Sequence, residues 1–170
     1  YQNSAALVLP KAWHQSVGSD SYYTSVTIDQ PAKAISASRF GMWGGGTHKF
    51  TDADVCMMIG NNPVVSQFTP FGGPPPFSPY ARLRDEMKKG MKVIVVDPRK
   101  TESANRATLH LQVNPGEDPT LLSGMIRIIM DEGLHDIEFC AHHIQDLEEL
   151  TARVEPFTPQ YAADRCGIPV

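Results

Sequence analysis

Residues 90–97 have the sequence Gly-Met-Lys-Val-Ile-Val-Val-Asp, and this stretch decides the fold class. A short, nearly continuous apolar run is typical of a strand that is buried on both faces of a parallel sheet. The amphipathic segment 80–89 precedes it and ends at Gly90, so a helix leads directly into this strand. An earlier apolar run, residues 55–59, ends at Gly60 and predicts a further strand buried on both faces. Strand, helix and strand in this order predict a βαβ unit.

The segments that follow continue the alternation of helix and strand. Residues 108–113 alternate in polarity and predict a third strand near the sheet edge, after a short helix through 101–107 that Thr101 would cap. Asp118 would cap a long helix with an apolar stripe, which Gly133 ends. Shorter helices are predicted to start at Asp136, Asp146 and Thr158. The predicted fold class is α/β, a Rossmann-like three-layer sandwich around a mostly parallel sheet.

The length of 170 residues and the hydrophobic content of 41% suit one compact core. Residues 1–50 are predicted to form an irregular arm, with short helices through 5–15 and 31–39, that belongs to the same binding region. Residues 51–170 are predicted to form the Rossmann-like domain, with the proline-rich stretch 67–79 as a surface excursion. Tyr1 opens the chain in place of an initiator methionine, so we expect a fragment of a longer protein.

Composition argues against several classes of function. The 15 basic and 19 acidic residues give a net charge of −4, and the basic residues are scattered, so nucleic acid is not an expected partner. No apolar run is long enough to cross a bilayer, so no membrane segment is expected in this chain. The 3 cysteines are far apart and show no Cys-x-x-Cys spacing, which indicates small core residues. His142 and His143 are adjacent, so on a helix they point about 100° apart and cannot both bind one metal.

The residues just after each strand are the first candidates for ligand binding, because ligands of open parallel sheets bind at the carboxyl ends of the strands. After the first strand, Gly60 allows a close backbone approach, and Asn61 and Asn62 offer amide groups that suit a pyrophosphate. An ordinary Asn/Gly/Pro turn is the alternative interpretation of these three residues.

The second and third strands are followed by charged turns. Asp97 could accept hydrogen bonds from ribose hydroxyls or purine N–H groups, while Arg99 or Thr101 could reach a phosphate. Alternatively, Asp97 caps the following turn and Arg99 is solvated or paired. Gly116 and Asp118 place a glycine turn and a carboxylate before the long helix, where Asp118 could be an N-cap, a ligand contact or both. No Walker lysine, Gly-x-Gly-x-x-Gly turn or Gly-x-Ser-x-Gly elbow is present, which argues against ordinary ATP, NAD and serine-hydrolase sites.

Taken in order along the chain, these motifs resemble a known family. The resemblance is carried by Ile59-Gly60-Asn61-Asn62-Pro63, Asp97-Pro98-Arg99-Lys100-Thr101, Pro115-Gly116-Glu117-Asp118 and Gly133-Leu134-His135-Asp136. Together they are similar to the molybdopterin oxidoreductases of the dimethyl-sulfoxide-reductase type, which include formate dehydrogenases and nitrate reductases. The resemblance is close over residues 54–169 and looser over 1–46.

The resemblance implies a cofactor and its contacts. Such enzymes hold molybdenum or tungsten between two pterin dithiolenes, each extended by a guanine dinucleotide. The matching positions imply that Gly60, Asn61 and Asn62, with Ile59 before and Ser66 after them, contact the phosphate and pterin side. Asp97, Pro98, Arg99 and Thr101 would contact the guanosine and a phosphate, and Gly116 and Asp118 the guanosine end. Asp29 is the nearest candidate metal ligand, with a helix-start aspartate as the alternative, and a 4Fe-4S cluster is expected in a missing N-terminal part.

The function implied by the resemblance is an oxidoreductase of anaerobic respiration, similar to formate dehydrogenase, in which this fragment binds the nucleotide tail and positions the metal. The isolated fragment is expected to be inactive. The expected partners are the cofactor, the remaining domains of the polypeptide and electron-transfer subunits, in a prokaryotic cytoplasm or periplasm, with the cytoplasm preferred. One alternative is a non-catalytic structural or electron-transfer domain that has lost the cofactor. Another is a flavodoxin-like domain for a different nucleotide.

Overall fold

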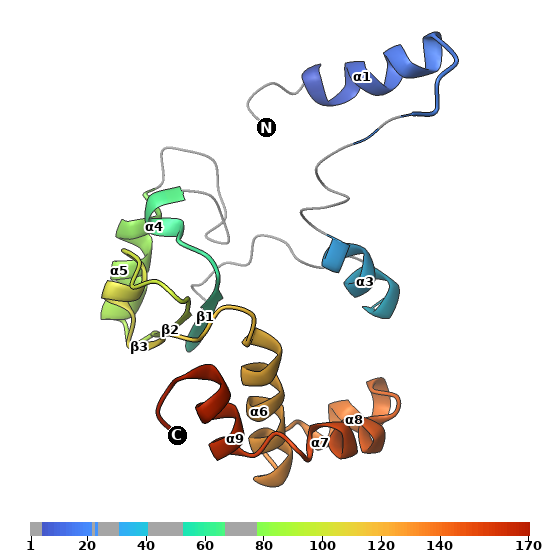
Figure 1. Cartoon of the computed structure of the whole chain (residues 1–170). Coiled ribbons are helices and arrows are strands. Elements are labelled where there is room, and N and C mark those ends of the chain that lie inside the picture. Colours follow the sequence, from blue (N-terminus) through green and yellow to red (C-terminus); the bar gives the residue numbers. More distant parts are fainter. Residues whose placement is uncertain (1–4, 22, 24–30, 41–52, 67–77) are drawn as a thin grey trace. The chain divides into compact units, whose positions relative to one another are not determined.

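The structure is a computed structural model that describes residues 5–21, 23, 31–40, 53–66 and 78–170 (Figure 1). The chain divides into two compact units, Tyr1–Gly46 and Thr47–Val170. The predicted domain boundary after residue 50 stays a prediction. In the first unit the described elements are two helices, α1 (Ala5–Ser16) and α3 (Pro31–Phe40). They agree with the helices predicted through 5–15 and 31–39.

The second unit contains a three-stranded parallel sheet in the order β1-β2-β3, formed by β1 (Val55–Ile59), β2 (Lys92–Val96) and β3 (Leu109–Leu111). The register pairs Ile59 with Val96, and Val96 with Leu111, so the carboxyl ends of all three strands meet at one edge. This parallel sheet with helices between its strands confirms the predicted α/β class.

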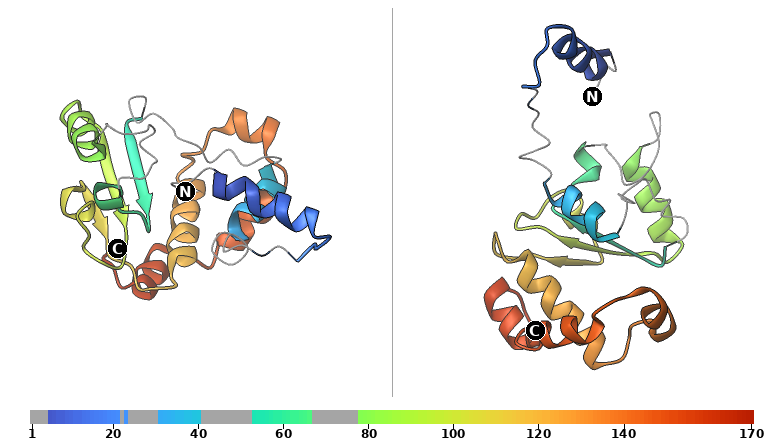
Figure 2. Two further views of the ribbon diagram at one scale, coloured as in Figure 1. Left: turned by 90° about the horizontal axis from the view of Figure 1, so that it is seen from above. Right: turned by 90° about the vertical axis from the view of Figure 1, so that its right-hand side faces the viewer.

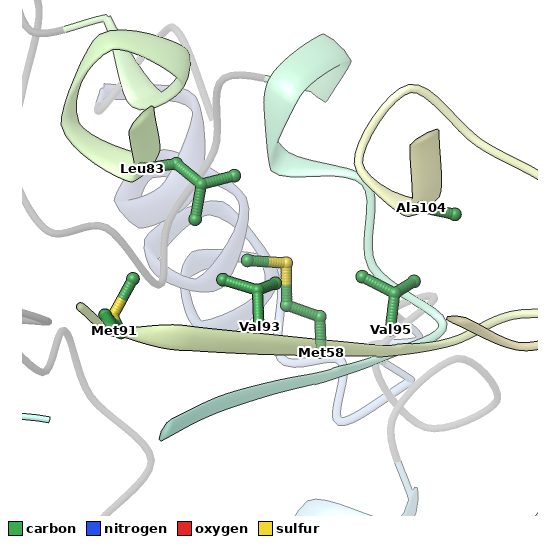
Figure 3. Close-up of a cluster of buried hydrophobic side chains, with 6 residues drawn as sticks. All are labelled: Met58, Leu83, Met91, Val93, Val95 and Ala104. Atoms are coloured by element: carbon green, nitrogen blue, oxygen red, sulfur yellow. The ribbon is translucent and has the colours of Figure 1, made fainter. Parts of the chain in front are cut away.

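One face of the sheet packs against α5 (Pro79–Lys88) and the short 3-10 helix η2 (Ala104–Arg106). Val93 and Val95 of β2 have no exposed surface and belong to one buried cluster with Leu83 of α5, which is 1% exposed (Figure 3). Burying side chains of this kind stabilises the fold by about 1.5–3 kcal/mol each. Ser78 caps α5 by accepting a hydrogen bond from the Ala81 N–H.

The opposite face packs against α6 (Asp118–Asp131) and α9 (Pro159–Cys166), so helices lie on both sides of the sheet (Figure 2). Val96, Val113, Leu121 and Cys166 form this second core. Gly124 of α6 allows close packing, because a Cβ added there would lie 2.7 Å from Cβ of Ala162 in α9. The unit is completed by α4 (Pro63–Ser66), α7 (Ile137–His143) and α8 (Leu147–Val154), the last of which contacts α6.

Several local predictions are corrected by the structure. β1 is buried on one face only, because α6 and α9 pack over β2 and β3, and Val55, Met57 and Ile59 are 38–53% exposed. The helix predicted through 101–107 is reduced to η2, and β3 is shorter than predicted. The N-cap of α6 is Glu117, not Asp118, which already lies in the first turn. Within the described part of the chain, no helix has the length and apolar character needed to span a membrane.

Candidate functional site

The turns that follow β1 and β2 meet at the carboxyl edge of the sheet. Each turn residue extends the backbone pairing by one step: Gly60 N–H donates to the Val96 carbonyl at 2.9 Å, and Asp97 N–H donates to the Leu111 carbonyl at 3.2 Å. The structure therefore brings Gly60 and Asp97 to neighbouring positions at the edge where an open parallel sheet binds its ligands.

Gly60 opens space in front of β1. Its φ of +58° lies in the left-handed region, and a Cβ added there would meet no atom of the described residues within 4 Å. Ile59 before it is 42% exposed, and Asn61 after it is half-buried. A ligand can therefore approach the backbone of this turn closely, which a side chain at position 60 would hinder.

Asn62 uses its side chain within the chain. Its Oδ1 accepts hydrogen bonds from the Ser103 backbone N–H at 3.2 Å and from the Ser103 hydroxyl at 2.7 Å. Its Nδ2 donates to the Glu102 carboxylate at 2.8 Å. This hydrogen bond, together with one from the backbone of Glu102 itself, lowers the pKa of Glu102. Ser66 ends α4, and its side chain lies outside the described residues.

Asp97 is a buried carboxylate at the tip of β2. It is 5% exposed, and its Oδ1 accepts a hydrogen bond from the Arg99 backbone N–H at 2.8 Å, which closes the turn around Pro98. Arg99 Nε lies 3.9 Å from the same oxygen, but the Arg99 side chain is 80% exposed. Because the guanidinium is solvated and its contact with the carboxylate is long, the pair contributes about 0–1 kcal/mol, so Arg99 can turn towards an anion at little cost.

Thr101 faces inward and serves its own turn. It is 6% exposed, its hydroxyl accepts a hydrogen bond from the Ala104 N–H at 3.1 Å, and its own N–H donates to the Arg99 carbonyl at 2.9 Å. The phosphate contact predicted for Thr101 stays a prediction.

The turn before α6 contains Gly116, with a φ of +91° and no atom of the described residues within 4 Å of an added Cβ. Asp118 is half-buried in the first turn of α6. The adjacent Glu117 accepts hydrogen bonds from the Thr120 hydroxyl at 2.7 Å and from Arg165. These bonds lower the pKa of Glu117, and the same pairing raises the pKa of Arg165. Arg165 thereby balances a negative charge beside Gly116.

Two side chains of β3 and its extension hold the Asp97 turn, and the sequence analysis missed both. His110 Nε2 lies 2.9 Å from the Asp97 carbonyl oxygen, and since a carbonyl only accepts, this nitrogen carries the hydrogen. Gln112 Nε2 donates to the Pro98 carbonyl at 2.9 Å. Their spacing of two residues on a strand that follows the Asp97 turn was the available signal.

The candidate metal ligand Asp29 lies outside the described residues. Among the residues that are described, no group of three or more histidine, cysteine or carboxylate side chains could hold a metal ion. Cys166 is a fully buried core residue, as predicted, and Cys56 is partly buried against the first core.

The family model for molybdopterin oxidoreductases matches residues 2–144, which is most of the chain. The chain belongs to this family. It is 37% identical over 121 residues to the F420-dependent formate dehydrogenase subunit alpha of Methanocaldococcus jannaschii, covering 68% of this chain and 16% of that protein. It is 40% identical over 91 residues to a nitrate reductase of Synechocystis sp., covering 52% of this chain and 13% of the relative.

A solved structure of a family relative shares the fold. The acetylene hydratase from Pelobacter acetylenicus matches with a TM-score of 0.60 and 30% sequence identity, over 71% of this chain and 16% of that one. The chain therefore spans about 13–16% of the length of these relatives. Family membership implies a molybdopterin cofactor with molybdenum or tungsten.

Proposed function

We propose that this chain holds the guanine dinucleotide tail of a bis-molybdopterin cofactor, as one part of a molybdenum or tungsten oxidoreductase. When bound, the metal and its pterins supply two-electron redox chemistry, and the chain binds and orients them. One observation carries the proposal. Two neighbouring strands end at the same sheet edge. The first is followed by a glycine turn that a ligand can approach, and the second by a buried carboxylate with an exposed guanidinium beside it.

The donors and acceptors at this edge fit a nucleotide. A carboxylate at Asp97 can accept hydrogen bonds from guanine N–H groups or ribose hydroxyls, and the guanidinium of Arg99 can donate two parallel bonds to a phosphate. Gly60 and Gly116 leave room for the ligand to approach the backbone. The negative charge of Asp118 disfavours a phosphate at the start of α6, so this carboxylate suits the guanosine end.

In this proposal the 4Fe-4S cluster and the substrate-binding residues belong to other parts of the complete enzyme or to electron-transfer subunits, and Asp29 stays the candidate metal ligand in this chain. The relatives named above include a formate dehydrogenase, a nitrate reductase and an acetylene hydratase. Since relatives with such different substrates share this segment, the segment itself is assigned to the cofactor and not to substrate selection.

The proposal is tested with Asp97→Asn and Asp97→Ala in the complete gene product. Asp97→Asn keeps an oxygen for the Arg99 N–H but removes the charge, whereas Asp97→Ala removes both. A hydrogen bond to a charged group contributes about 1.5–3 kcal/mol, so cofactor affinity should fall by about tenfold or more in both variants. Metal and guanine per polypeptide, measured after gel filtration, report the loss.

Asp136 provides a matched control, because its carboxylate also accepts a backbone N–H, that of Phe139 at 2.9 Å, at the start of α7. Asp136→Asn and Asp136→Ala should leave metal and guanine content unchanged. Undiminished content in both Asp97 variants contradicts the proposal. A wild-type protein that carries neither metal nor guanine favours a non-catalytic structural or electron-transfer domain with the same fold.

A further inference from the structure

The side chain of Asn62 is almost fully occupied by bonds inside the chain. An amide oxygen has two lone pairs, and both are used by the backbone N–H and the hydroxyl of Ser103. One of the two amide hydrogens is used by Glu102. The oxygen of Asn62 is therefore saturated by the protein and has no remaining capacity to accept a bond from a ligand.

The partner of Asn62 lies far along the chain and deep in the fold. Ser103 is 41 residues away in sequence and has no exposed surface. It lies one residue before η2, in the connection that begins at Asp97 and includes the turn at Thr101. The Asn62–Ser103 contact thus joins the loop after β1 to the loop after β2, beyond the last backbone bond between them, from Gly60 to Val96.

We propose that Asn62 and Ser103 are positioning residues that hold the Gly60 turn and the Asp97 turn at a fixed separation, so that both grip one nucleotide. This inference rests on the proposed function. It gives the Asn62 oxygen an indirect role, through the two turns, and leaves one amide hydrogen that can donate to the cofactor. Its distinctive consequence is coupling. Ser103→Ala removes the hydroxyl bond and keeps the backbone bond, whereas Asn62→Ala removes both, so the effect of Ser103→Ala is contained in that of Asn62→Ala.

The test uses Asn62→Ala, Ser103→Ala and the double variant in the complete gene product. After gel filtration and dilution, the rate of guanine nucleotide loss should rise by about tenfold or more in Asn62→Ala, which loses every bond of this side chain. It should rise by a smaller factor, about threefold or more, in Ser103→Ala, which keeps the backbone bond to Asn62. The double variant should lose guanine no faster than the faster single variant. If Asn62→Ala releases guanine while Ser103→Ala retains it at the wild-type rate, the Ser103 hydroxyl does not hold the turns and the inference is wrong.

A reciprocal exchange supplies a rescue. Asn62→Asp keeps the acceptor for Ser103 but faces the Glu102 carboxylate, so it should release guanine faster than wild type. Adding Glu102→Gln restores a donor and acceptor pair and should return the rate to within about twofold of wild type. Failure of this rescue overturns the inference, because the pairing would then not be what positions the turns.

Thr108→Val separates positioning from general stability. The Thr108 hydroxyl accepts a hydrogen bond from the Val93 N–H at 3.1 Å, at the opposite end of β2. This variant should release guanine at the wild-type rate, and release as fast as in Asn62→Ala would overturn the inference.

If Asp97→Ala loses guanine while the Asn62 and Ser103 variants keep it, the inference alone fails. A wild-type protein without guanine overturns the proposed function and this inference together.

Discussion

Gly60→Ala tests whether a ligand approaches the backbone after β1. The φ of +58° at this residue costs an alanine about 1–2 kcal/mol, partly offset by about 0.4–1 kcal/mol from the less flexible unfolded chain. No described atom lies within 4 Å of the added methyl group, so the protein itself adds no steric cost. The free energy of unfolding should therefore fall by about 1 kcal/mol, as measured by urea titration. In the complete gene product, metal and guanine content should fall by about tenfold or more, because the methyl group occupies the space of the ligand.

Gly133 offers the matched control. Its φ is +64° and an added Cβ there also meets no described atom within 4 Å, but it lies after α6, away from the strand ends. Gly133→Ala should lose the same stability, about 1 kcal/mol, and no cofactor. Equal cofactor content in the two variants would refute the close approach at Gly60. A loss of stability in Gly60→Ala that is several kcal/mol larger than in Gly133→Ala would refute the strain argument.

Two further predictions concern packing and charge. Gly124→Ala places a methyl group 2.7 Å from Cβ of Ala162, well inside ordinary carbon contact. The free energy of unfolding should therefore fall by about 1 kcal/mol, although alanine has the better helix propensity. In an Ala162→Gly background the same substitution should be stabilising, and a destabilisation there would contradict the packing argument. The hydrogen bond from Asn62 lowers the pKa of Glu102 in the folded protein. This bond therefore stabilises the fold at pH values above the pKa of Glu102 in the unfolded chain, near 4.3, and the stabilisation is lost as the pH falls through the folded pKa. In Asn62→Ala the pKa of Glu102, followed by carboxyl carbon NMR, should rise towards its ordinary value, and an unchanged titration would show that the hydrogen bond is not the cause.

Local patterns were sufficient to predict most of the elements. The apolar run at residues 92–96 forms strand β2, and the Thr158-Pro159 and Asp136 signals lie at the starts of α9 and α7. Apolar runs and helix caps depend on residues close together in the chain, so a local pattern predicts them. The exposure of one face of β1 could not be predicted in this way. It depends on where α6 and α9 pack, which a pattern within five residues does not encode.

The candidate site was predictable as a set of turns but not as a set of contacts. Gly60 and Asp97 lie at strand ends that are adjacent in the sheet, which follows from the parallel order. Asn62 bonds Ser103, which is 41 positions away, and the Asp97 carbonyl bonds His110, which is 13 positions away. Such pairings are decided by packing in three dimensions, so side chains that suit a ligand by type can be used by the protein itself.

Some strand-end residues are bonded to the protein itself and others remain open to a ligand, and this difference decides how variants of the site should be interpreted. The backbone pairing of the strands ends one step past them, at the N–H groups of Gly60 and Asp97. Beyond that step, side-chain bonds from Asn62, His110 and Gln112 hold the turns. Loss of cofactor on changing one of these three residues would not by itself identify a ligand contact. The Arg99 guanidinium is exposed and the Gly60 turn is open, so neither is tied by such side-chain bonds to the part of the protein that the structure describes. Substitutions at these two residues therefore report on the ligand more directly. Coupling between variants, and not the size of a single effect, therefore distinguishes residues that bind the nucleotide from residues that hold the binding turns in place.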